Sequence, residues 1–196
     1  MEKSFNSIYS FNTIYLDTSS VMRPQFLSFM RMIIPKIKNN DKCPVVVLQQ
    51  VMNELRVLSH REDNETAQKA RQALEGLNAL FKADLLVLKG NPNDHSIPDS
   101  LFMEIAMHAR HTGESTLFIT QDFQLAKELL SVNKLSSSRG TSCKALKINK
   151  YGMLEEFDFS KDRPSLSFQP LHTYHSPRVA HPYDRKTTLI LKRFGL

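Results

Sequence analysis

Short runs of aliphatic and β-branched residues alternate with helical segments over residues 13–149 of this 196-residue chain. The clearest run, residues 44–48, contains no polar side chain, which is typical of a strand buried on both faces of a sheet. Between the runs, apolar residues recur at three- and four-residue spacing, as they do along one face of a helix. Strands that alternate with helices in this way predict a mainly parallel sheet covered by helices on both faces.

The pattern predicts a three-layer α/β/α domain with a five-stranded sheet over residues 1–158. The strands are expected at residues 13–17, 44–48, 85–88, 116–120 and 145–149. The helices are expected from Pro24 to about residue 34, and at residues 49–58, 65–82, 98–111 and 122–132. After this domain, four prolines interrupt a stretch with few aliphatic residues. Residues 159–196 are therefore predicted to form a separate C-terminal extension.

The predicted extension is the most basic part of the chain. Residues 161–196 hold seven Lys or Arg and two Asp, which accounts for +5 of the net charge of +6. Basic segments of this kind contact nucleic-acid phosphates, with an affinity that falls as the salt concentration rises. An extension that only improves solubility explains the charge equally well.

The remaining composition favours a soluble protein of the cytoplasm. Hydrophobic residues make up 41% of the chain and charged residues 23%, and every apolar run is too short to span a bilayer. The first residues have no apolar core of signal-peptide length. Cys43 and Cys143 are the only cysteines, and two isolated thiols are expected to stay reduced.

Four acidic residues stand near the ends of predicted strands or at the start of a helix. They are Asp17 after the first strand, Glu54 in the helix after the second, Asp99 at a helix start and Asp122 after the fourth strand. The carboxyl ends of parallel strands open onto one crevice, where ligands bind. Carboxylates brought into one crevice repel each other unless cations lie between them. The joint pattern predicts a divalent-metal site and phosphoryl chemistry.

Each acid taken alone has an ordinary explanation, because Asp also caps helices. Other phosphate-handling and metal-binding classes fit the chain less well. The 6 glycines provide no phosphate-binding loop after the first strand. A haloacid-dehalogenase-like enzyme would have an acid where Ser19 stands, and a response-regulator receiver would have one where Lys89 and Gly90 stand. His108 and His111 are spaced for a zinc pair but have no accompanying third ligand.

Four segments resemble the signature segments of PIN-domain nucleases in their order and roughly in their spacing. They are residues 15–19, 51–55, 99–106 and 119–126, and the resemblance covers about residues 13–150. The most specific piece is Thr120-x-Asp122-x-x-Leu125-Ala126 after a predicted strand. The resemblance implies a five-stranded parallel sheet, bound Mg²⁺ or Mn²⁺ and hydrolysis of RNA phosphodiester bonds, with endonucleolytic cleavage expected.

The same resemblance implies roles for particular side chains. Asp17, Glu54, Asp99 and Asp122 would form the catalytic, metal-binding set, with Ser19 and Thr120 assisting them. Metal held there would lower the pKa of its bound water and stabilise the leaving oxygen. The alternative is a non-catalytic RNA-binding or scaffold protein of the same fold. The two differ in whether neutralising the acids removes an activity.

Several basic residues are candidate contacts for the RNA backbone. They are Arg23, Arg56, Arg139, Lys144, Arg178 and Arg185. In the extension, aromatic residues alternate with arginines, which suits single-stranded RNA because rings stack on unpaired bases. Docking of the extension onto the domain is an alternative that stays open. The choice of partner also stays open among a second copy of the chain, a protein antitoxin and another protein.

Overall fold

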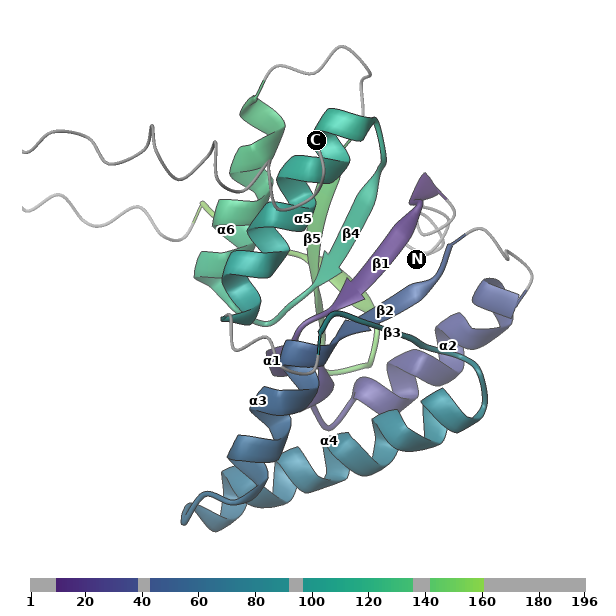
Figure 1. Cartoon of the computed structure of the whole chain (residues 1–196), viewed down its shortest axis with the longest axis vertical. Helices are drawn as coiled ribbons and strands as arrows, with labels where there is room; N and C mark the ends of the chain where they lie inside the picture. Colours follow the sequence, from purple (N-terminus) through teal and green to yellow (C-terminus); the bar gives the residue numbers. More distant parts are fainter. Residues whose placement is uncertain (1–9, 39–42, 92–96, 136–141, 161–196) are drawn as a thin grey trace, which may run out of the picture. The chain divides into compact units, whose positions relative to one another are not determined.

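The computed structural model describes residues 10–38, 43–91, 97–135 and 142–160 (Figure 1). Its sheet has the strand order β3-β2-β1-β4-β5-β6. The strands are β1 (Thr13–Leu16), β2 (Val45–Leu48), β3 (Val87–Lys89), β4 (Thr116–Ile119), β5 (Cys143–Ile148) and β6 (Leu154–Glu156). Strands β1 to β5 pair in parallel, whereas β6 is antiparallel to β5. The prediction of a mainly parallel sheet is confirmed.

Helices lie around this sheet. They are α1 (Thr18–Val21), α2 (Phe26–Lys38), α3 (Gln49–Ser59), α4 (Asn64–Lys82), α5 (Pro98–Thr112) and α6 (Phe123–Ser131), followed by the short 3₁₀ helix η3 (Val132–Lys134). The sheet grows from β1 to β3 in one direction and from β4 to β5 in the other. Right-handed connections therefore place the helices of the two halves on opposite faces. Figure 1 shows α5 and α6 beside β4 and β5, apart from α2, α3 and α4.

Besides shifts at element ends, such as the start of α2 at Phe26 rather than Pro24 and of β5 at Cys143 rather than residue 145, three local differences separate the structure from the predicted elements. The predicted count of five strands is one short, because β6 has three residues and only Leu154 among them is buried. Strand β3 begins at Val87 rather than residue 85, since the Leu85 N–H bonds back to the Leu80 carbonyl at the end of α4 (3.0 Å). The third difference is α1, a single turn of four residues whose only apolar side chain is Val21.

An aromatic cluster joins α5 to the centre of the sheet. The rings of Tyr15 on β1 and Phe118 on β4 stack with centroids 5.4 Å apart. Phe102 on α5 meets both rings edge-on, at 6.4 Å and 5.7 Å. Such pairs stabilise the packing beyond the apolar area that they bury. Because Phe102 lies one turn after Asp99, this cluster fixes the start of α5 near the carboxyl ends of β1 and β4.

The chain divides into two units after Asp158. Residues 161–196 lie outside the described residues, so the separate C-terminal extension stays a prediction. Among the helices that the structure describes, none has the length and apolar content needed to cross a membrane.

Candidate active site

Asp17 lies at the point where the order of the sheet reverses. Strand β1 has β2 on one side and β4 on the other, so the sheet extends from it in both directions. In open α/β sheets, ligands bind at such a switch point, outside the carboxyl ends of the strands. Asp17 keeps an extended backbone (φ −89°, ψ 154°), and its N–H donates to the Ile119 carbonyl at 3.0 Å. Its side chain is 7% exposed.

Two hydroxyl groups hold the Asp17 carboxylate. Thr120 Oγ1 donates to Asp17 Oδ2 at 2.8 Å, and Ser19 Oγ donates to the same oxygen. Each hydroxyl also accepts a backbone N–H from the segment after β4, from Asp122 at 2.9 Å and from Gln121 at 2.8 Å. The hydroxyl protons are thus directed at Asp17, and the predicted assisting residues contact the acid that they were expected to assist.

The pKa of Asp17 reflects two opposing effects. Burial raises it above the ordinary value, because the charged form loses its water. The hydrogen bonds from Ser19 and Thr120 act in the opposite direction, since they stabilise the ionised form. Burial is the larger of the two effects on the pKa. A nearby cation would offset the effect of burial, because it stabilises the ionised carboxylate.

Glu54 reaches the same edge from α3. Its Oε2 accepts a hydrogen bond from Thr18 Oγ1 at 2.5 Å, across 36 positions of the sequence. Thr18 directly follows Asp17, so this contact brings α3 to the end of β1. Glu54 is itself exposed, which leaves its carboxylate accessible to solvent.

Asp122 caps a helix and also lies at the carboxyl end of β4, where the acidic site was predicted. Its side chain caps α6 by accepting the Leu125 N–H at 2.9 Å. The capping explanation is therefore correct for this residue. Asp122 is also exposed and stands two residues after Thr120, so it lies beside the hydroxyl network at the end of β4.

The pKa of Asp99 is affected by the charges of the other three acids. Its pKa is raised from 3.8 to about 6, first by partial loss of solvent and then by the negative charges of Asp17, Asp122 and Glu54. These charges act over short range in a partly desolvated site. The carboxylates of four separate segments therefore lie close enough for the charges of three of them to act on the fourth.

The predicted acidic set did not include Glu128, whose charge also raises the pKa of Asp99. Glu128 lies on the exposed side of α6, where its Oε1 accepts from Gln124 Nε2 at 2.7 Å. Its i, i+4 spacing from Gln124 resembles any solvated helix face, so the sequence carried no signal for it. Among the described residues, no three Asp, Glu, His or Cys side chains are gathered closely enough to form a preformed metal cage.

The predicted RNA contacts are spread over the chain. Arg23 is exposed beyond α1, near the acids in sequence and at the same edge of the sheet. Arg56 is exposed on α3 and donates to Asn53 Oδ1 at 2.9 Å. Lys144 pairs in register with Leu117 near the amino end of β5. It lies four residues, or about 13 Å, from the carboxyl end of that strand. Arg139, Arg178 and Arg185 lie outside the described residues.

Known proteins include a distant structural neighbour of this chain. A search of curated proteins finds no match to this chain. One solved structure, a domain of a functionally unknown protein from Methanocaldococcus jannaschii DSM 2661, is similar at 13% sequence identity with a TM-score of 0.46. That match covers 75% of this chain and 96% of the other.

A family profile described as PIN domain matches residues 14–128, which is more than half of the chain. The matched region contains Asp17, Glu54, Asp99 and Asp122. PIN domains are generally nucleases that act on nucleic acids with divalent metals. With its mainly parallel sheet and its helices on both faces, this chain belongs to the PIN-domain family.

Proposed function

We propose that the chain is a metal-dependent ribonuclease that cuts within RNA strands. Mg²⁺ or Mn²⁺ would be held by Asp17, Glu54, Asp99 and Asp122, the catalytic set. The observation that carries this proposal is the convergence of three carboxylate charges on Asp99, from segments far apart in the sequence. Family membership supports nucleic-acid hydrolysis as the class of reaction.

The donor set fits these cations. All four acids offer carboxylate oxygens, the ligand type that Mg²⁺ prefers, and three of them are exposed enough to leave room for metal-bound water. The mutual repulsion that raises the pKa of Asp99 is the kind that a cation relieves. When bound, the metal would supply a water of lowered pKa and stabilise the charge of the leaving oxygen.

The hydroxyl groups have positioning roles in this proposal. Thr120 and Ser19 direct two protons at Asp17 Oδ2, which orients the carboxylate and favours its ionised form. Thr120 also accepts the Asp122 N–H, so it couples the positions of two acids. Thr18 orients the Glu54 carboxylate in the same way. These hydrogen bonds reduce the motion of the acids before substrate binds.

Single-stranded RNA is the proposed substrate. Arg23 and Arg56 are exposed and follow Asp17 and Glu54 closely in the sequence, and they would contact the backbone phosphates. Arg139, Arg178 and Arg185 remain in the proposal on the strength of the sequence alone. Lys144 is left out, because it lies toward the opposite end of β5. We assign this activity to the cytoplasm, since Cys43 and Cys143 are buried free thiols.

The test is cleavage of labelled single-stranded RNA by the full chain, with Mn²⁺ or with EDTA. Asp122→Asn is the active-site variant and Asp63→Asn is its matched control. Both residues cap a helix, α6 and α4 respectively, and Asn caps nearly as well as Asp. Helix capping is thus equal in the two variants, and only Asp122 belongs to the acidic site. We expect Asp122→Asn to lower metal-dependent cleavage at least a hundredfold and Asp63→Asn to leave it unchanged.

Two results would contradict the proposal. Equal loss of cleavage in both variants would mean that capping, not the acidic site, explains the effect. Absence of metal-dependent cleavage in the wild type, together with salt-sensitive RNA binding that Asp122→Asn does not change, would favour a non-catalytic RNA-binding protein of this fold.

A further inference from the structure

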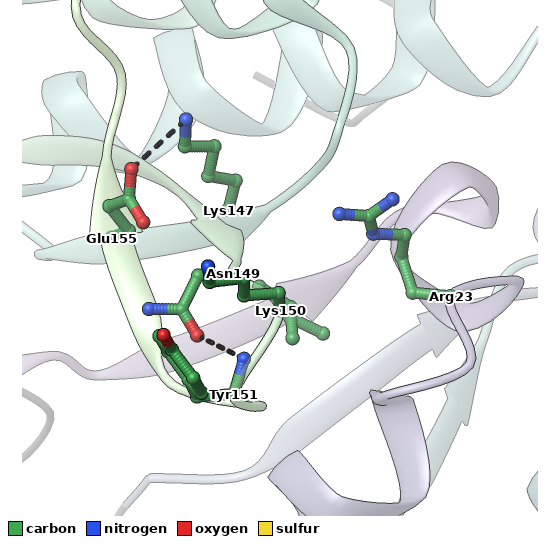
Figure 2. A pocket seen from close by; sticks show the side chains of 7 residues that line it. Arg23, Lys147, Asn149, Lys150, Tyr151 and Glu155 are labelled. Carbon is green, nitrogen blue, oxygen red and sulfur yellow. Dashed lines mark hydrogen bonds and ion pairs between the residues drawn. The ribbon is translucent and has the colours of Figure 1, made fainter.

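A shallow cavity of about 280 Å³ opens at the carboxyl end of β5, on the same edge of the sheet as the ends of β1 and β4. It is lined by Arg23, which follows α1, and by residues of the β5–β6 hairpin (Figure 2). The hairpin contributes Lys147, Asn149, Lys150, Tyr151 and Glu155. Figure 2 shows Arg23 facing Asn149 and Lys150 across the cavity. None of the four proposed catalytic acids lines it, so the cavity is a separate feature of the same edge.

The sequence of the hairpin turn fixes its shape. Asn149 Oδ1 accepts the N–H groups of Tyr151 at 2.9 Å and Met153 at 3.0 Å, which closes the turn from within. Gly152 has φ +76°, a conformation that glycine adopts at low cost. A Cβ at this position would lie 3.3 Å from Ser28 Cβ and 3.4 Å from the Phe29 nitrogen. The turn therefore packs closely on α2, and this packing holds it opposite Arg23.

Gln121 connects the cavity to the acidic site. Its backbone N–H donates to Ser19 Oγ at 2.8 Å, within the hydroxyl network around Asp17. In the orientation that pairs both atoms of its side-chain amide, that amide accepts the Ile148 N–H at 2.8 Å and donates to the Ile148 carbonyl at 3.3 Å. Ile148 is part of the cavity wall. One residue thus spans from the hydroxyl network to the cavity.

The charge of the cavity is positive. Lys147 is paired with Glu155 at 3.2 Å, whereas Arg23 and Lys150, the other two cations of the cavity, form no ion pair with a described carboxylate. The Lys150 Nζ lies 5.0 Å from the centre of the Tyr151 ring, and Tyr151 is 67% exposed. An exposed ring in a cavity with these two cations matches the chemistry of a nucleotide, because the ring stacks on the base while the cations bind the phosphate.

We propose that this cavity is a nucleotide subsite, in which Arg23 and Lys150 bind a phosphate of single-stranded RNA and Tyr151 stacks on the adjoining base. The inference rests on the ribonuclease function proposed above and specifies how the substrate strand is held. The strand crosses the acidic site at β1 and β4 and continues over the end of β5. The subsite contributes binding, whereas the acids carry the chemistry.

The test measures binding of a short single-stranded RNA to the full chain in EDTA by fluorescence anisotropy at several salt concentrations. The double variant Arg23→Gln with Lys150→Gln is expected to lower the slope of log affinity against log salt by roughly 0.7, since the two cations bind one phosphate and each neutralised phosphate contributes roughly 0.7. Tyr151→Ala is expected to weaken binding roughly tenfold, from the loss of one stacked base.

The matched control is Arg61→Gln with Lys82→Gln. Arg61 follows α3 and Lys82 ends α4; both are exposed cations outside the cavity. This control removes the same charge, so a general electrostatic effect would appear in both double variants. Far-ultraviolet circular dichroism verifies that each variant is folded, as expected for substitutions of exposed side chains.

The outcomes separate this proposal from the proposed function. If the cavity variants bind RNA as the Arg61 and Lys82 control does, the subsite is wrong, whether or not Asp122→Asn abolishes cleavage. If the cavity variants lose binding as expected while the wild type does not cleave RNA, the subsite holds and the ribonuclease assignment fails.

Discussion

At the scale of single residues, the pKa of Asp99 shows how the acids affect one another. This pKa is raised from 3.8 to about 6, first by partial loss of solvent and next by the negative charges of the neighbouring acids. A carboxyl group that binds its proton more tightly in the folded protein than in the unfolded chain destabilises the fold once it ionises. In the metal-free protein, this cost is absent below about pH 4 and complete above about pH 6 to 7.

Asp99→Asn is therefore expected to stabilise the metal-free protein at neutral pH. The predicted gain is about 1 kcal/mol, after allowance for the solvent that screens this exposed carboxyl group. The gain should appear as the pH rises from 4 to 7, because only ionised Asp99 is repelled by its neighbours. Urea unfolding in EDTA at pH 4.5 and pH 7.5 measures it. A difference between variant and wild type that is the same at both pH values would contradict the charge cluster.

The sequence identified some of these residues better than others. Thr120 and Asp122 follow an apolar strand directly, so their place at the carboxyl edge could be predicted from local pattern alone. The bond from Thr18 to Glu54 joins residues 36 positions apart, and no local pattern marks a contact of that kind. Glu128 was missed for the same reason, because its approach to Asp99 depends on how α5 and α6 pack.

At the scale of secondary-structure elements, α5 is positioned by its aromatic contact with the sheet. Phe102 is 1% exposed and meets Tyr15 and Phe118, which lie on the two strands that frame the site. Asp99 is in the first turn of the same helix. A change in the packing of Phe102 would thus move a carboxylate without removing it.

Phe102→Leu is expected to reduce metal-dependent RNA cleavage roughly tenfold, because small displacements of positioned groups have large effects on rate. Its stability should fall by about 1–2 kcal/mol. Phe29→Leu in α2 is the matched control, since Phe29 is 0% exposed and belongs to a different helix. It should lose similar stability and keep its cleavage rate. Similar cleavage in both variants would show that α5 does not position Asp99.

Strand prediction succeeded for the buried strands and missed the short strand β6. The four-residue runs of β2 and β4 are buried throughout, so they are apolar and easy to recognise. Strand β6 is antiparallel and exposes Glu155 and Glu156, and its place depends on the turn at Gly152 rather than on an apolar run. The candidate subsite depends on this turn, so the sequence pointed only to Arg23.

At the scale of the whole molecule, the proposed account separates chemistry from strand binding. The four proposed catalytic acids lie within residues 10–135, whereas most of the net charge belongs to residues 161–196. Under this proposal, the domain would cut RNA and the predicted extension would increase the affinity for it. The division after Asp158 supplies a place to test it.

A chain truncated after Ser160 is expected to keep its fold and its cleavage rate at saturating RNA. Its affinity for RNA should fall, and the salt slope should decrease by roughly 0.7 for each phosphate that the extension binds in the full chain. Circular dichroism, cleavage kinetics and anisotropy measure the three quantities. An unchanged affinity and slope would mean that residues 161–196 serve another purpose, such as solubility or docking.

The central claim is that the carboxylates jointly hold a divalent cation, and calorimetric titration of the full chain with Mn²⁺ tests it most directly. We predict saturable binding to the wild type and to Asp63→Asn, weakened at least tenfold in Asp17→Asn, with each variant folded by circular dichroism. Equal Mn²⁺ affinity in Asp17→Asn and the wild type, or absence of saturable binding in the wild type, would contradict the account.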